Sequence, residues 1–166
     1  MFNLPQITEE DVQSMDAALD DLIAKCGATT VLITDVGGAM LTKKGKLESF
    51  DTTSIAALAS NSFNATQMIA SLINEPNFSS VYQQGDHYSL LVANVSDYCL
   101  LIIIFNASIS VGMVKFYAGE TVKRVAAQMK AASERAPGET LDLVEMNIAD
   151  VDELFRRRKA EGGAGQ

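Results

Sequence analysis

The amino-acid sequence predicts a single α/β domain in which helices cover a five-stranded, largely antiparallel sheet in the order αββαβββα. Two observations predict this class. Segments with apolar residues at helical spacing alternate with short runs of β-branched and apolar residues. The chain of 166 residues can bury one core but not the cores of two ordinary domains.

The first helix is predicted to begin after Thr8, because Thr8 and Asp11 have the spacing of an N-terminal cap. An amphipathic repeat follows, and Gly27 ends the helix. A hairpin is predicted next, with strands at 28–34 and 39–42, a turn at 35–38 and a basic turn at 43–46.

A second helix is predicted over residues 53–74, with a cap among residues 51–54 and a stop before Pro76. Strands are predicted at 79–84, 88–95 and 98–105, with a further strand at 111–117 and a third helix at 120–134. The strand at 98–105 is apolar without alternation, which is typical of a strand covered on both faces. We therefore expect the first and third helices on one face of the sheet and the second helix on the other.

The domain is predicted to occupy residues 1–135, followed by a linker at 136–146, a helix at 147–159 and a flexible tail at 160–166. One side of the C-terminal helix is apolar, and a basic cluster at 156–159 ends it, where the helix dipole favours cations. The apolar side consists of Ile148, Val151, Leu154 and Phe155. This helix either folds back onto its own domain or docks on a partner.

Composition excludes several classes of function. The 13 basic and 21 acidic residues give a net charge of −8, which disfavours nucleic acid and anionic membranes as partners. His87 is the only histidine, which excludes a multi-histidine metal site, and Cys26 and Cys99 are predicted to be buried thiols. Since no signal peptide or membrane span is evident, we expect a soluble, cytoplasmic protein without a cofactor.

No catalytic motif is evident. Gly45 and Lys46 do not belong to a phosphate-binding P-loop, because Met40 stands where the first glycine is required and Leu47 replaces Ser or Thr. We therefore expect a protein that is not an enzyme.

The most informative segment is the predicted second helix, which has no charged residue from 52 to 74. The side predicted to pack on the sheet consists of Ile55, Leu58, Ser62, Ala65, Ile69 and Leu72. The other side consists of Ala57, Asn61, Asn64, Gln67, Met68 and Ser71, flanked by Ala56 and Phe63. Either this helix is buried, within the monomer or against a second copy, or it docks a partner protein.

A series of segments resembles the Roadblock/dynein-light-chain family over residues 7–158. The segments are 32–35 with Gly38, 51–58, 72–78, 103–106 with 110–114, and 148–155. The resemblance implies a cytoplasmic homodimer, with a cell pole as one location, that activates GTP hydrolysis by a small Ras-like GTPase.

In this family the sheets of a dimer join through the third strand and the central helices lie side by side. The resemblance thus implies a dimer interface at Ser80, Val81, Tyr82, Gln83, Gln84 and Ala57. It implies GTPase contacts at Asn61, Asn64, Gln67, Met68, Ser71, Ile148, Val151, Leu154 and Phe155. Where the family is rich in Ala and Gly along the docking side, this chain has Asn64 and Met68.

No arginine occurs from residue 1 to 123, so the second helix cannot supply an arginine finger, a device worth ~10³–10⁵ in rate. This chain would instead activate hydrolysis by holding the GTPase's own switch residues in place. Two alternatives are a scaffold that tethers a GTPase without activating it, and a ligand-sensing domain. The second needs an apolar cavity, which the packed run at 100–105 disfavours.

Overall fold

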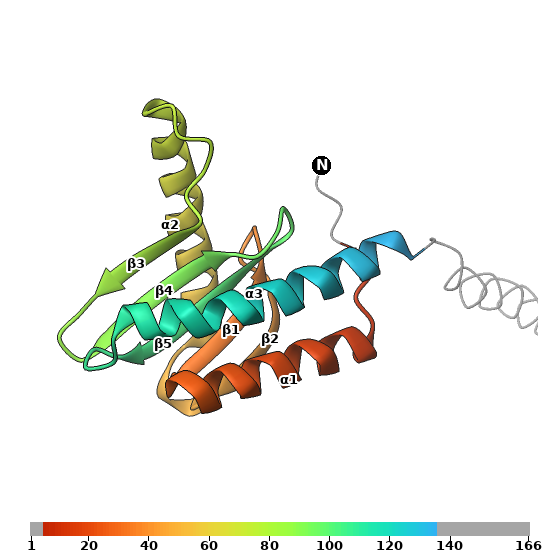
Figure 1. Cartoon of the computed structure of the whole chain (residues 1–166), viewed down its shortest axis with the longest axis horizontal. Coiled ribbons are helices and arrows are strands. Elements are labelled where there is room, and N and C mark those ends of the chain that lie inside the picture. Colours follow the sequence, from red (N-terminus) through yellow and green to blue (C-terminus); the bar gives the residue numbers. More distant parts are fainter. Residues whose placement is uncertain (1–4, 136–166) are drawn as a thin grey trace, which may run out of the picture. The chain divides into compact units, whose positions relative to one another are not determined.

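The computed structural model describes residues 5–135, which form three α-helices, one 3₁₀ turn and a five-stranded sheet (Figure 1). The elements are α1 (Glu9–Cys26), β1 (Thr30–Asp35), β2 (Met40–Gly45), η1 (Leu47–Ser49), α2 (Thr52–Leu72), β3 (Ser80–Gln84), β4 (Tyr88–Asn94), β5 (Cys99–Asn106) and α3 (Val111–Glu134). All neighbouring strands are antiparallel, in the order β2-β1-β5-β4-β3. The predicted α/β fold is confirmed.

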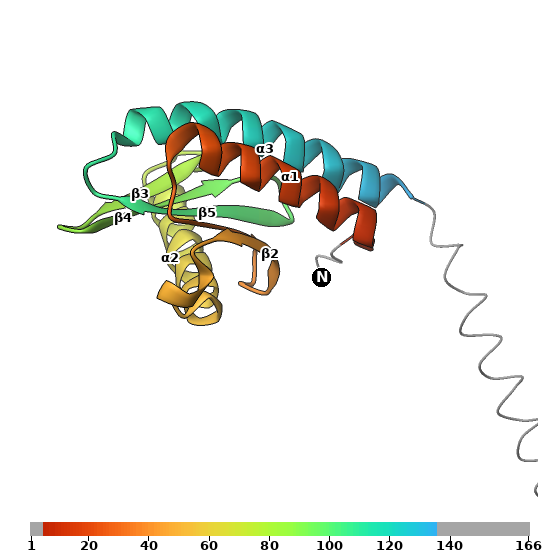
Figure 2. The ribbon, with the colours of Figure 1, turned by 90° about the horizontal axis from the view of Figure 1, so that it is seen from below.

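Helices cover the two faces of the sheet as predicted. Figure 2 shows α1 and α3 on one face and α2 on the other. Alternate residues of β5 reach into both cores: Leu101, Ile103 and Phe105 join the core under α1 and α3, and Leu100 and Ile102 join the core under α2. Because β5 is the central strand with both faces covered, its run of apolar residues does not alternate with polar ones.

The ends of the helices follow the predicted capping chemistry. The Thr8 side chain accepts from the Asp11 amide, and the Asp11 carboxylate accepts from the Thr8 amide at 2.7 Å. Gly27 ends α1 in the left-handed conformation, with φ 71°. The Asp51 carboxylate caps α2 by accepting from the Ser54 amide at 3.1 Å.

The predicted strand at 111–117 is wrong, because these residues form the first turns of α3. The Asn106 side chain accepts from the Ser108 amide at 2.9 Å, so a tight turn leads from β5 directly into the helix. The buried residues of α3 recur at helical spacing, as Val114, Ala118, Thr121, Val125, Met129 and Ala132. The valines and aromatic residues at its start have strand propensity, but tertiary packing decides in favour of helix.

The two outer strands of the sheet differ in charge. β2 is longer than predicted and includes Lys43 and Lys44, which were expected in a turn. The Lys44 ammonium lies 3.2 Å from the Asp16 carboxylate and 3.6 Å from that of Asp20, both on α1. β3, at the opposite edge, has the uncharged sequence Ser-Val-Tyr-Gln-Gln.

Among residues 5–135, no helix is long and apolar enough to cross a membrane.

Candidate partner-binding surface

The side of α2 that packs on the sheet differs from the predicted one. Its buried residues are Thr52, Ala56, Ala59, Ser60, Phe63 and Ala70. Leu58 and Leu72, which were predicted to face the sheet, are 68% and 83% exposed. Small residues let the helix approach the strands closely, and the Ser60 hydroxyl lies 3.2 Å from that of Thr34 on β1. The larger aliphatic side chains are left on the outside.

Five of the six residues predicted to face outward on α2 do so. Ala57, Asn61, Asn64, Met68 and Ser71 are exposed, and Met68 is 72% exposed. Gln67 is half-buried, while Ala56 and Phe63, which were predicted to flank this side, are buried against the sheet. Leu58 and Leu72 join the exposed residues, so the outer surface of α2 is more apolar than predicted.

Asn64 anchors the turn between β1 and β2. Its side-chain amide donates to the Val36 carbonyl at 3.0 Å. The turn lies directly against α2 at Gly38, where a Cβ atom would be 2.8 Å from the Cα of Ala57. Ala57 therefore lies beside this turn, and its place in a dimer interface with the residues of β3 stays a prediction.

Gln67 holds the connector between α2 and β3. Its amide nitrogen donates to the Phe78 carbonyl at 2.8 Å, and its amide oxygen accepts from the Phe78 N–H at 3.0 Å. The same connector returns to the helix where the Glu75 N–H donates to the Ala70 carbonyl at 2.9 Å. The amide group of Gln67 is thus engaged within the chain, so its effect on a partner would be indirect.

Replacing Gln67 with Ala is expected to lower the free energy of unfolding by about 1–3 kcal/mol, because both hydrogen bonds to the part-buried Phe78 backbone are lost. Urea denaturation measures this, and hydrogen exchange should accelerate at the Phe78 amide. Gln13→Ala, at an exposed position of α1, is the control and should change neither quantity. Equal stability of the two variants would contradict the structural role of Gln67.

Neither the C-terminal turns of α2 nor the edge strand β3 carries a charged residue. Figure 1 shows the end of α2 projecting beyond β3. Large apolar side chains are exposed on this projecting end, namely Met68, Ile69, Leu72 and Ile73. Of the predicted interface strand, Ser80, Val81 and Tyr82 are half-buried and Gln83 and Gln84 are exposed. An apolar helix end beside an unprotected sheet edge is typical of a surface that another chain covers.

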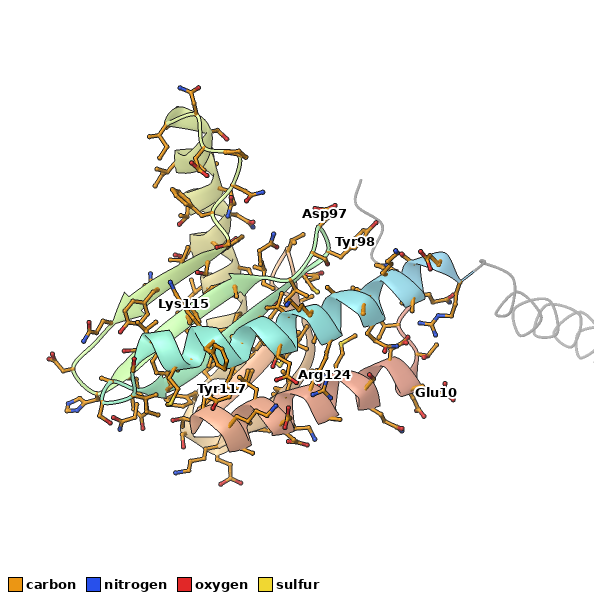
Figure 3. All side chains as sticks on the ribbon, in the orientation of Figure 1. Glu10, Asp97, Tyr98, Lys115, Tyr117 and Arg124 are labelled. Carbon is orange, nitrogen blue, oxygen red and sulfur yellow. The ribbon has the colours of Figure 1, made fainter. Side chains whose placement is uncertain are left out.

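Arg124 lies on the opposite face of the sheet from α2. Its guanidinium is 3.3 Å from the Asp21 carboxylate, and the Lys25 ammonium bridges Asp21 and Glu120 at 2.9 Å each. Figure 3 shows Arg124 between α3 and α1. The sheet therefore separates this arginine from the outer surface of α2 in the same chain.

The described residues 5–135 contain no group of three or more His, Cys, Asp or Glu side chains that could hold a metal ion. Cys26 and Cys99 are free and buried, as predicted. Burial raises the pKa of the Cys99 thiol to about 11, so it stays protonated and is a poor nucleophile at neutral pH. The C-terminal residues Ile148, Val151, Leu154 and Phe155 lie outside the described residues, and their proposed role stays a prediction.

The fold defines an α/β domain with an uncharged helix on one face of the sheet and an uncharged strand at one edge. The family model of the Roadblock/LC7 domain matches residues 15–105, and the chain belongs to this family. A comparison with curated proteins found no match.

Solved structures with the same fold include MglB of Myxococcus xanthus, which is 24% identical, with a TM-score of 0.73 over 79% of this chain and 98% of that one. The gliding protein mglB of Thermus thermophilus is 22% identical, with a TM-score of 0.72 over 79% of this chain and 99% of that one. A Roadblock/LC7 domain from Streptomyces avermitilis is 17% identical, with a TM-score of 0.61 over 69% of this chain and 97% of that one.

Proposed function

We propose that this chain is a homodimeric, non-enzymatic regulator of a small Ras-like GTPase of the MglA type, and that it activates GTP hydrolysis. The observation that carries the proposal is the outer surface of α2, where Asn61, Met68 and Leu72 are exposed on a helix without a single charged residue. Such a surface is costly in open solvent and typical of the core of a protein interface. Membership of the Roadblock/LC7 family and the likeness to MglB structures support the GTPase as the partner.

The dimer in this proposal forms through β3 and α2. β3 is an outer strand without charge, so its unpaired backbone groups can continue the sheet into a second copy. Pairing β3 with β3 would place the two α2 helices on the same side of the joined sheet. Their outer surfaces would then form one composite docking surface for the GTPase.

Activation in this proposal works without an arginine finger. α2 has no arginine, and Arg124 is held by Asp21 on the other face of the sheet. The chain would act by fixing the switch loops of the GTPase, so that the catalytic groups of the GTPase itself are in place. The segment at 147–159 would add a second, tethered contact.

Mixing the full chain with a small Ras-like GTPase encoded beside it tests the proposal. We expect binding by calorimetry and faster release of phosphate from GTP. Binding with unchanged GTP turnover would favour the tethering scaffold instead. An absence of binding would contradict both functions.

Arg124→Ala is expected to leave stimulated GTP hydrolysis nearly unchanged, because Arg124 is paired with Asp21 away from the docking surface. Loss of an arginine finger would lower the stimulated rate by ~10³-fold or more. Single-turnover phosphate release at saturating regulator measures the difference. A loss of that size with intact binding would contradict a mechanism without a finger.

A further inference from the structure

An open apolar groove lies on the α2 face of the sheet, at the end where β3 and β4 are joined. Its volume is about 390 Å³, and none of the residues that line it is charged. Those used in the argument are Phe50, Ile55, Gln83, Tyr88 and Leu90. Phe50 and Tyr88 pack edge-to-face in it, with ring centroids 5.2 Å apart. The groove is therefore a preformed apolar surface beside the first turns of α2.

α2 leaves the sheet at the opposite end of β3. The Gln67 side chain is hydrogen-bonded to the backbone of Phe78, two residues before β3 begins at Ser80. The helix therefore crosses β3 near the start of that strand. The groove includes Gln83 and Gln84, at the end of β3. The projecting end of α2 and the groove thus lie on the same face of the sheet, at opposite ends of the same edge strand.

A two-fold axis beside the middle of β3, between the two paired strands, would bring these two features together. If β3 pairs with β3 of a second copy in antiparallel fashion, the start of one strand lies beside the end of the other. The projecting end of each α2 then passes over the groove of its partner. Residues 68–72 of this helix and its C-cap Ile73 together span about 9 Å. This length is close to two strand spacings, which is far enough to cover the β3 and β4 of the partner.

The side of α2 that meets the groove follows from helical periodicity. Ile55 lines the groove from within the same chain. Ile69 and Ile73 follow Ile55 by 14 and 18 residues, so at about 100° per residue they lie within about 40° of it around the helix axis. Ile69 is 53% exposed and Ile73 is 61% exposed. The exposed isoleucines therefore point to the side on which the helix of the second copy would lie.

We propose that Ile69 and Ile73 of each protomer fill the groove formed by Phe50, Ile55, Gln83, Tyr88 and Leu90 of a second copy. This contact rests on the proposed dimer, and it assigns an occupant to the groove. It leaves Met68 and Leu72 on the outer surface, available to the GTPase.

Ile73→Lys in the full chain tests this contact. The lysine lies at the C-terminal end of α2, where the helix dipole tolerates a cation. In the dimer its ammonium would be buried in an uncharged groove, twice by symmetry. We expect the dimer dissociation constant, measured by analytical ultracentrifugation, to rise at least ~100-fold. Circular dichroism should be unchanged.

Gln83→Glu is the rescue. Val81 packs under α2, and Gln83 two residues later points to the same face, so a carboxylate there would meet the partner's lysine. The double variant Ile73→Lys with Gln83→Glu should regain most of the lost affinity, in a salt-dependent way. Phe116→Lys, at a 76% exposed position of α3 on the other face of the sheet, is the control and should leave the dimer intact.

The outcomes separate the groove contact from the function on which it rests. A wild-type chain that is monomeric at micromolar concentration would contradict the proposed dimer itself. A wild-type dimer that Ile73→Lys does not weaken would contradict only the groove contact. Dissociation by Ile73→Lys without rescue by Gln83→Glu would also overturn the groove as the site that Ile73 fills.

Discussion

Met68→Arg is expected to abolish GTPase binding while the chain stays folded and dimeric. Met68 is 72% exposed and lies on the outer surface of α2, so the longer side chain meets no neighbour within the chain. In the complex the guanidinium would be buried without a partner, which costs about 2–5 kcal/mol, or a roughly 30- to 5,000-fold loss of affinity. Calorimetric titration of the GTPase with the variant measures this loss.

Phe116→Arg is the matched control for Met68→Arg. Phe116 is 76% exposed, but it lies on α3, on the other face of the sheet. The same kind of change should leave GTPase affinity and the stimulated rate of hydrolysis unaltered. Wild-type affinity in both variants would move the docking surface away from α2. The same loss of affinity in both variants would point to a non-specific effect of added positive charge.

Asn64→Arg would be a poorer probe of the same surface. Its side-chain amide is bonded to the Val36 carbonyl, so the substitution also frees the turn between β1 and β2. A loss of binding could then arise from the displaced turn. Met68→Arg is the better test, because it changes the docking surface without breaking a hydrogen bond that holds this turn.

Gly38→Ala is expected to lower the free energy of unfolding by about 2–5 kcal/mol, from backbone strain together with overpacking. Gly38 has φ 94°, which an L-residue rarely adopts, and its Cβ would lie 2.8 Å from the Cα of Ala57. Since the obstacle is the backbone of α2, either the turn or the helix must move. Urea denaturation gives the change in stability, and altered GTPase affinity would report displacement of α2.

Two other glycines provide controls for Gly38→Ala. Gly37 is in the same turn, but its added Cβ would approach only the Asp35 side chain, at 3.3 Å, so we expect a small effect. Gly119 lies within α3 with nothing within 4 Å of the added atom, and Gly119→Ala should stabilise the fold by about 0.5–1 kcal/mol. A Gly38→Ala variant as stable as Gly37→Ala would contradict close contact between the turn and α2.

Local chemistry predicted most of the fold. The capping pair of Thr8 and Asp11, Gly27 and the Asp51 cap fixed the ends of helices because each satisfies backbone groups within a few residues. The unbroken apolar run in β5 correctly predicted a strand with helices on both faces. By contrast, the strand prediction at residues 111–117 is wrong. The residues of this short segment have strand propensity, and the helical repeat to which they belong becomes clear only over the full length of α3.

The orientation of α2 could not be predicted from its sequence. A helix with charge on one side reveals which side faces solvent, but residues 52–72 carry no charge anywhere. The prediction placed the larger aliphatic residues on the buried side. In the structure, the small residues Ala56, Ala59 and Ser60 are buried, because they let the helix pack close to the sheet. The roles of Asn64 and Gln67 were also hidden, because their partners Val36 and Phe78 become neighbours only in the folded chain.

The unequal edges of the sheet have a consequence for how far assembly can proceed. A sheet with two open edges could add copies without end, as in a fibre. Here Lys43 and Lys44 line β2, and Lys44 is paired with Asp16 of α1, so a further strand would have to strip these charges of water and of their partners. Within residues 5–135, β3 is the edge strand left to accept another strand, and pairing of two copies there would use the open edge of each. In the proposed dimer, strand addition would therefore stop at two chains and no fibre would form.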